Sequence, residues 1–282
     1  MKKFLLHMLL CLAVLVLFNF AYIWVVGSHL RDYQSRYFTV PDKVRLLVLG
    51  DSHTGRAWAT NKDPLCFSFA MGSDNITDMR MKFDYVDAHN HWEGEKAVVL
   101  PFEPHVLSIY RETKQNNTDN RTINNPYINE HITYWLPLFF DTQTSMDVKR
   151  FILKDVLRQG KKTVRFSKRH ARWRADGQFP DSTVSKTLIR EYQDLIDHVQ
   201  KRGYTIIPVR YPLHPYYDSL VRAKPTAAYL TQVIDSLATA NRLQVYDMMS
   251  AFEDPTLYVD QDHLNEKGAA IFRQRFAERY HY

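Results

Sequence analysis

The sequence predicts an α/β domain built on an open parallel sheet, and three observations support this class. Short apolar runs rich in β-branched residues recur along the chain, as expected for strands buried on both faces. Segments with apolar residues at three- and four-residue steps separate them, as in amphipathic helices. Beyond an apolar N-terminal segment about 240 residues remain, enough for one full core. Alternating strands and helices predict right-handed βαβ units and a doubly wound sheet.

The N-terminal segment from Phe4 to Val26 contains no Asp, Glu, Lys or Arg and is long enough to cross a bilayer. It is predicted to be a transmembrane helix and an uncleaved anchor over residues 1–26, with a signal cleaved near Gly27 as the alternative. Lys2 and Lys3 precede it and favour a cytoplasmic N-terminus. The remainder of the chain is therefore expected on the extracytoplasmic side, in the periplasm or outside the cell.

Residues 27–43 are interpreted as a tether that ends at the turn signal of Pro41 and Asp42. The folded domain then spans residues 44–282. Its strands are predicted at 44–49, 65–71, 97–100, 205–209 and 243–246, and its clearest helices at 184–202 and 227–240.

An insertion at about residues 103–180 breaks this alternation, with an Asn-rich loop, a helix expected around 146–157 and a basic run from Lys161 to Arg174. Basic side chains interleaved with aromatic ones can bind nucleic acid, but an extracytoplasmic domain seldom meets any. Phospholipid headgroups or an anionic polysaccharide are the better candidate partners, and a solvated loop and helix end is the simpler alternative.

Metal and cysteine chemistry are not expected. Cys11 lies in the apolar segment and Cys66 in the domain, so a disulfide framework and a cysteine metal cluster are both excluded. The 12 histidines show no H-E-x-x-H or similar ligand spacing. No metal and no cofactor are therefore predicted.

The candidate nucleophile is Ser52, in the sequence Gly50-Asp51-Ser52-His53 directly after the first strand. Open α/β sheets bind their ligands at the carboxyl ends of the strands. A helix that begins near Thr54 would direct its amides and its dipole toward this serine. The motif alone is weak, because Asp and Ser also make good turn and helix-cap residues.

The candidate partners of Ser52 lie far downstream, where Asp260 and His263 have the spacing D-x-x-H just before a helix entered at Asn265. An imidazole can deprotonate a serine when an acceptor holds its other nitrogen. Asp262 is the rival acceptor, but an adjacent residue usually cannot fold back onto its neighbour's ring. The sequence therefore predicts a triad of Ser52, His263 and Asp260.

Together these two elements resemble the SGNH (GDSL-like) hydrolase superfamily, whose first block is Gly-Asp-Ser and whose last is D-x-x-H, here continued as His263-Leu264-Asn265 and Gly268. The resemblance implies a three-layer α/β/α fold with a flavodoxin-like parallel sheet. It also implies that the amide of Gly72, after the second strand, contributes to an oxyanion hole together with that of Ser52.

One block departs from the family pattern. The third strand usually leads into Gly-x-Asn-Asp, whereas this chain continues as Pro101-Phe102-Glu103-Pro104-His105. Loss of one oxyanion donor costs about two to three orders of magnitude in rate if nothing replaces it. Asn75 and His105 are the candidate substitutes, with capping or surface roles as the alternatives.

Further candidates for substrate binding are His53, Arg210 and His214. His53 after the serine is similar to the GDSH variant of bacterial proteins that O-acetylate envelope polysaccharides. Arg210 and His214 follow a predicted strand and so lie at the same edge of the sheet. For Arg210, pairing with a carboxylate is an equal alternative.

Two functions from different classes follow. The first is a serine esterase or O-acyltransferase that acts on acyl esters of a cell-envelope glycan through an acyl-enzyme. The membrane anchor resembles the layout of the membrane-tethered SGNH-like proteins of teichoic acid D-alanylation, which implies a membrane-bound O-acyltransferase as partner. The second is a non-catalytic SGNH-like protein that docks such an acyltransferase or binds glycan.

Overall fold

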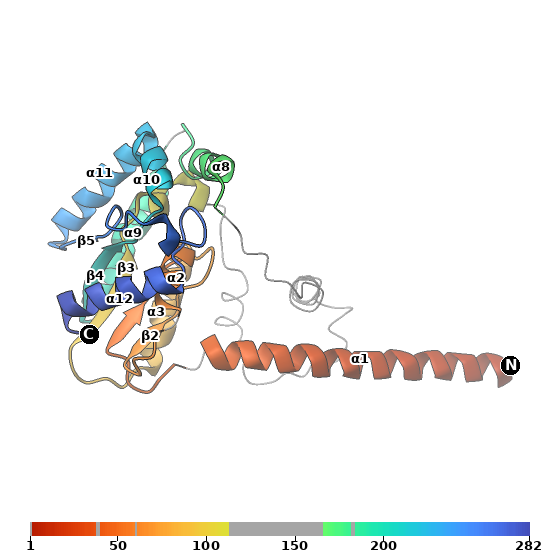
Figure 1. Ribbon diagram of the computed structural model, residues 1–282. Coiled ribbons are helices and arrows are strands. Elements are labelled where there is room, and N and C mark those ends of the chain that lie inside the picture. The colour runs from red at the N-terminus through yellow and green to blue at the C-terminus, as the bar shows by residue number, and fades with distance from the viewer. Residues whose placement is uncertain (1, 38–39, 60, 113–165, 182–183) are drawn as a thin grey trace. The chain divides into compact units, whose positions relative to one another are not determined.

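The computed structural model describes residues 2–37, 40–59, 61–112, 166–181 and 184–282 (Figure 1). The chain divides into two compact units, and the described part of the first is the N-terminal helix. The second contains Val40–Asn124 and Thr163–Tyr282 and holds all five strands. The Asn-rich loop and the helix expected around residues 146–157 lie outside the described residues.

Helix α1 (Lys2–Tyr37) is long and apolar enough over Lys2–Ala21 to span a membrane or to serve as a signal sequence. It does not stop at Val26, because residues 27–37, interpreted as a tether, continue the helix. No proline interrupts this stretch, and the first one, Pro41, disfavours helical backbone at the preceding residue.

The central sheet has five parallel strands in the order β2-β1-β3-β4-β5, which is the flavodoxin-like order. The strands are β1 (Leu46–Val48), β2 (Cys66–Ser68), β3 (Lys96–Pro101), β4 (Tyr204–Arg210) and β5 (Tyr246–Asp247). The predicted fold class is thus confirmed. Because β1 lies between β2 and β3, the loops after these two strands flank the loop that carries Ser52.

One face of the sheet is covered by α2 (Ser52–Trp58) and α12 (Glu266–Tyr280), which contact each other. A single core cluster joins Trp58, Phe272 and Phe276 of these helices to Val48, Val99 and Val209 of the strands. The edge-on packing of Trp58 against Phe276, with ring centroids 5.0 Å apart, joins the two helices to one another.

The other face is covered by α3 (Ile76–His89) and α9 (Lys186–Lys201), which also contact each other. Phe83 of α3 packs on Tyr204, whose side chain points to the opposite side from Ile207 and Val209 in the alternation of β4. Helices therefore cover both faces, and the three-layer arrangement is confirmed (Figure 1).

The other helices in the described part of the chain are α8 (Lys168–Gln178), α10 (Pro215–Arg222) and α11 (Pro225–Ala240), with 3-10 turns η1 (Pro104–Leu107), η2 (Ile109–Arg111) and η4 (Pro255–Leu257). The helices predicted at 184–202 and 227–240 correspond to α9 and α11. Helix α8 contacts α10 and η2, so the described ends of the predicted insertion lie against the domain.

Candidate active site

The loop between β1 and α2 positions Ser52. Gly50 has φ +143°, and a Cβ atom there would collide with the Thr54 hydroxyl, so this turn requires glycine. Asp51 caps α2, since its side chain accepts a hydrogen bond from the His53 amide at 3.0 Å. Ser52 is the first residue of α2 and stands at the carboxyl edge of the sheet, as predicted.

The loop after β2 brings Gly72 next to Ser52. The Met71 amide donates to the Gly50 carbonyl at 3.2 Å, and a Cβ atom built on Gly72 would lie 4.0 Å from Ser52 Cβ. Within the described residues, the Gly72 amide donates to no carbonyl or side chain. Gly72 therefore lies beside Ser52 with an amide that is not engaged by other described residues, and its oxyanion role stays a prediction.

The D-x-x-H segment forms a tight loop in front of α12. Tyr258 and Leu264 form an antiparallel bridge, and the Val259 amide donates to the His263 carbonyl at 2.8 Å. The Asp260 Oδ1 atom accepts hydrogen bonds from the amides of Asp262 and His263. Gly268 lets α12 approach this loop, because a Cβ atom there would collide with the Leu257 carbonyl.

The His263 ring is held from one side. Its Nδ1 atom is hydrogen-bonded to Asp260, 2.9 Å from Oδ1 and 3.0 Å from Oδ2. Its Nε2 atom is buried and has no hydrogen-bond partner in the described part of the chain, so no hydrogen bond to Ser52 is formed. The ring lies edge-on to His53, the neighbour of Ser52, with centroids 5.4 Å apart. The two predicted halves of the site thus meet.

Asp262 also reaches the His263 ring, with Oδ1 3.1 Å from Nδ1. The expectation that it cannot do so is wrong, because the turn centred on Asp260 brings both carboxylates to the same side of the imidazole. The hydrogen-bond geometry of Nδ1 is nevertheless better toward Asp260.

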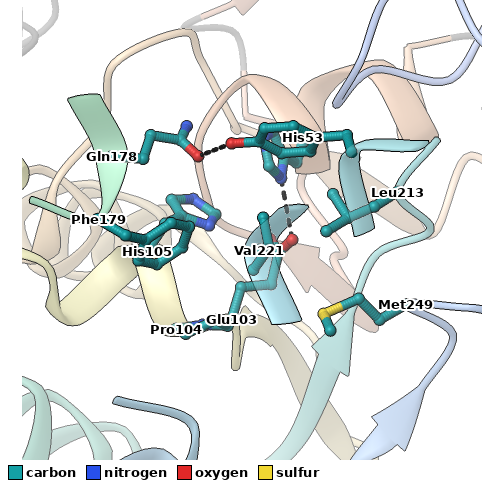
Figure 2. Close-up of a pocket in the computed structure, with 10 residues that line it drawn as sticks. His53, Glu103, Pro104, His105, Gln178, Phe179, Leu213, Val221 and Met249 are labelled. Carbon is teal, nitrogen blue, oxygen red and sulfur yellow. Dashed lines mark hydrogen bonds and ion pairs between the residues drawn. The ribbon is translucent and has the colours of Figure 1, made fainter. Parts of the chain in front are cut away.

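A buried group of charged side chains next to Ser52 joins the start of α2, the segment after β3, helix α8 and the loop before α12. Figure 2 shows three of its members, His53, Glu103 and His105. His53 bridges two carboxylates, with Nδ1 2.9 Å from Glu103 Oε1 and Nε2 3.3 Å from Asp262 Oδ2. Arg174 of α8 donates to the same Asp262 oxygen at 2.9 Å.

Asp51 forms the second branch of this group. Its Oδ2 atom lies 2.9 Å from His105 Nε2 and also pairs with Arg111. The rings of His53 and His105 are 4.5 Å apart, so the two branches touch. A small cavity lies beside them and is lined by His53, Glu103, His105, Gln178, Phe179 and Tyr217 among others (Figure 2).

The two adjacent imidazoles carry different charges. Burial by itself disfavours a cation at His53, but the charge of Glu103 and the contacts with both carboxylates outweigh it and raise its pKa to about 10. His105 has its pKa lowered to about 3, chiefly by burial and further by the neighbouring His53 and Arg174 cations. His53 is therefore an imidazolium at neutral pH, and His105 is neutral.

For His263, burial also disfavours the cation, but the hydrogen bonds to Asp260 and the interactions with Asp262 outweigh it and raise the pKa. A base whose conjugate acid is stabilised by carboxylates can take up a proton from a hydroxyl group more readily.

Two of the residues predicted to bind substrate, His53 and Arg210, have partners within the protein. His53 is only 3% exposed, and both of its nitrogens face carboxylates instead of solvent. Arg210 contacts Asp235, Asp247 and the Phe102 carbonyl, which is the structural pairing left open as its alternative. Both residues are therefore engaged within the protein.

Asn75, His105 and His214 also have partners. The side chain of Asn75 caps α3 in a capping box with Asp78, the alternative role considered for it. His105 is 3% exposed and bonded to Asp51. His214 caps α10 and stacks on Phe166, with ring centroids 3.9 Å apart. Its amide donates to the Gln261 carbonyl, so it stands beside the loop of His263.

Three charged members of the site, Glu103, Arg111 and Arg174, are not among the residues that the sequence predicts for it. Arg174 belongs to the basic run from Lys161 to Arg174, yet it pairs with buried Asp262. The sequence does contain one indication of Glu103. This carboxylate follows the third strand, in the block where the resembled family has its Asn donor, and so lies at the carboxyl edge of the sheet.

Among the described residues, two groups of side chains have the chemistry to hold a cation. They are Asp51, His53, Glu103 and His105, and His53, Asp262 and His263, with the candidate ligand atoms of each group within 4.8 Å of one another. In the first group Arg111 already neutralises Asp51, and His53 is itself cationic. These contacts do not favour a metal there.

Comparisons with known proteins give distant likenesses. No family model matches the chain, and no curated protein matches its sequence. Among solved structures, a lipase/acylhydrolase from Enterococcus faecalis is similar at 12% identity, covering 84% of this chain and 95% of that one, with a TM-score of 0.42. A GDSL-like lipase from Bacteroides thetaiotaomicron is similar at 9% identity, covering 89% of this chain and 98% of that one, with a TM-score of 0.43.

Proposed function

We propose that this protein is a serine esterase or O-acyltransferase of the SGNH type, in which Ser52 is the nucleophile, His263 the general base and Asp260 the residue that orients His263. The observation that carries the proposal is the state of the His263 ring. Nδ1 is hydrogen-bonded to Asp260, Nε2 is buried without a hydrogen-bond partner among the described residues, and the ring lies edge-on to His53, the neighbour of Ser52. An unpaired buried nitrogen is costly unless a reacting group uses it.

The reaction proceeds in two halves. Ser52 Oγ attacks the ester carbonyl carbon and gives its proton to His263 Nε2, and the carbonyl oxygen becomes an oxyanion near the amides of Gly72 and Ser52. The intermediate collapses as His263 returns the proton to the leaving alcohol. A second alcohol or water then attacks the acyl-enzyme and gives a proton to His263. The bond between the acyl group and Ser52 Oγ breaks as His263 returns this proton to Oγ, which restores Ser52 and the neutral base. Transfer and hydrolysis differ only in this second nucleophile.

The proposed substrate is an acylated cell-envelope glycan, with the domain held at the extracytoplasmic surface by α1 and assisted by a membrane-bound O-acyltransferase. The apolar helix, the preceding lysines and the GDSH-like sequence support this. Helix α8 adds exposed Arg169, Arg172 and Trp173, a combination suited to anionic headgroups or polysaccharide.

The second candidate is a non-catalytic protein that docks an acyltransferase or binds glycan. It is favoured by one observation, the unformed hydrogen bond between Ser52 and His263. Catalytic hydrogen bonds often tighten only when substrate is bound, so this geometry is also compatible with the first candidate.

A fluorophosphonate probe separates the two candidates. Full-length protein in detergent should be labelled at Ser52, as located by mass spectrometry, and should hydrolyse a short-chain nitrophenyl ester. Ser52→Ala and His263→Ala should abolish both, and Asp260→Ala should leave a residue of activity because it only orients and stabilises the imidazolium. Ser236→Ala, at an exposed serine of α11, is the matched control. Absence of labelling at Ser52 would contradict the enzyme proposal and favour the non-catalytic docking or glycan-binding protein.

Two measurements test the proposed membrane setting. Protease added to intact spheroplasts should digest the domain, whereas full protection or a mature N-terminus at Ser28 would contradict an extracytoplasmic anchored protein. Liposome pelleting should show preference for anionic over neutral lipid and loss of binding at high salt. Equal binding to both lipids would contradict the proposal that Arg169 and Arg172 of α8 bind anionic headgroups.

A further inference from the structure

A continuous row of buried polar contacts leads from β3 to the proposed base. Glu103 follows β3, His53 lies in α2, and Asp262 and His263 share the loop before α12. Successive contacts measure 2.9 Å from Glu103 Oε1 to His53 Nδ1, 3.3 Å from His53 Nε2 to Asp262 Oδ2, and 3.1 Å from Asp262 Oδ1 to His263 Nδ1. The first three residues are at most 3% exposed.

We propose that Glu103 and His53 are positioning residues for His263, because Glu103 fixes the His53 ring, His53 and Arg174 together hold Asp262, and Asp262 supports the Nδ1 side of His263. This inference rests on the proposed function, in which His263 is the base. It assigns a role to the carboxylate that stands beside the place of the family's Asn donor.

The energetics of Asp262 explain why such support is needed. A carboxylate buried to this degree stays ionised only when cations face it, and here an imidazolium and a guanidinium contact the same oxygen. With His53 removed, Arg174 alone would face that oxygen from a side chain that is 24% exposed. Asp262 would then be free to move away from His263, which would keep only Asp260.

Glu103 supplies the matching support for His53. Its Oε1 atom binds His53, while its Oε2 atom is buried with no hydrogen-bond partner among the described residues. A buried carboxylate oxygen without a hydrogen bond costs free energy. Because Oε2 has no donor among the described residues, the contact of Oε1 with His53 sets the position of this carboxylate. His53 in turn cannot rotate without breaking contacts with two carboxylates.

Two neighbours of His263, the proposed base, act on its pKa in opposite directions. The His53 cation disfavours a proton on His263, whereas the Asp262 anion favours it. The other charged or titratable groups around this pair must remain in place during a test, and they are Asp51, His105, Arg111, Arg174, Tyr217 and Asp260.

The test uses the pH dependence of fluorophosphonate labelling of the full-length protein. The rate should rise with pH as His263 loses its proton. His53→Gln should lower the plateau rate about tenfold, because Asp262, and with it the Nδ1 side of His263, loses its fixed position. Asp262→Asn should also lower the plateau rate, and it should move the midpoint to lower pH because the anion at Nδ1 is lost. A slower plateau in a variant that circular dichroism shows to be fully folded at the assay pH is not expected from residues that only stabilise the fold.

Glu103→Gln and a control complete the set. Glu103→Gln keeps the side-chain shape and should slow labelling less than His53→Gln does. His198→Gln removes a histidine that pairs with Asp84 at 2.5 Å on the far layer of helices, and should change neither plateau nor midpoint. The inference is overturned if His53→Gln and Glu103→Gln both label at the wild-type rate, within about twofold, with the wild-type midpoint.

A second readout separates this inference from the proposed function. In full-length protein labelled with ¹³C,¹⁵N-histidine, the imidazole signals of His263 should titrate differently in wild type and in Glu103→Gln, with signals assigned by single His→Gln variants. If the wild-type protein is not labelled by the probe, the esterase proposal fails, and these spectra still decide on the contacts. Identical His263 titrations in the two proteins would overturn the inference.

Discussion

The two loops that flank Ser52 are stabilised in different ways. The loop after β2 is held by residues near it in sequence: Asp74 accepts from the Met71 amide, and Lys82 contacts both Asp74 and the Phe69 carbonyl. The loop after β3 is held by residues far away, since Glu103 and His105 bind His53 and Asp51, at sequence separations of 50 and 54. The first loop can form as a local unit, whereas the second takes its shape only when the sheet edge is assembled.

The largest effect on stability is expected at Lys82 in the locally held loop after β2. Its side chain is fully buried, and its Nζ atom lies 2.7 Å from Asp74 Oδ2. Lys82→Met should lower the free energy of unfolding by about 3–5 kcal/mol, because it leaves a buried carboxylate without its cation. Urea unfolding followed by circular dichroism measures it.

Lys96→Met serves as the control for Lys82, since Lys96 is partly exposed and lies 3.8 Å from Asp87. Its effect should stay below about 1 kcal/mol. Equal losses for the two variants would show that the buried pair does not stabilise the loop after β2 in particular.

The contacts of the loop after β3 with His53 and His105 should make the free energy of unfolding depend on pH. His53 has its folded pKa raised to about 10, so its stabilising contribution is complete below its unfolded value of 6.5 and is lost as pH rises toward 10. His105 has its folded pKa lowered to about 3, so its contribution is complete above 6.5 and is lost as pH falls toward 3. Each should change the free energy of unfolding on the order of 1–3 kcal/mol.

Urea midpoints measured across this pH range check the two signs. His53→Gln should flatten the decline on the alkaline side, and His105→Gln should flatten the decline on the acid side. If both variants flatten the same side, the opposite charge states assigned to these neighbouring rings are wrong.

The smallest effect concerns the cap of α3. Asn75→Ala should cost about 1 kcal/mol, whereas Asn75→Ser, which keeps a capping oxygen, should cost only a few tenths. Neither should slow probe labelling, because the amides of Gly72 and Ser52 are the proposed oxyanion donors. A hundredfold slower reaction of the stable Asn75→Ser protein would instead make the Asn75 side chain an oxyanion donor.

The same contrast explains what the sequence could predict. Strands, helices and the D-x-x-H turn depend on local patterns, so the fold class and the Asp260–His263 hydrogen bond were predictable. The pairing of Glu103 with His53 and of Arg174 with Asp262 depends on which loops meet at the sheet edge. Spacing carries no information about that, and a basic run such as the one that contains Arg174 is normally solvated.

The packing of α2 against α12 has a consequence for biosynthesis. The Arg273 side chain donates to the Ala57 carbonyl at 2.7 Å, although 216 residues separate them in the chain. Such distant contacts form late, after the intervening chain has been synthesised. Ser52 emerges from the ribosome long before His263, so these two side chains come together only after nearly the whole chain has been synthesised.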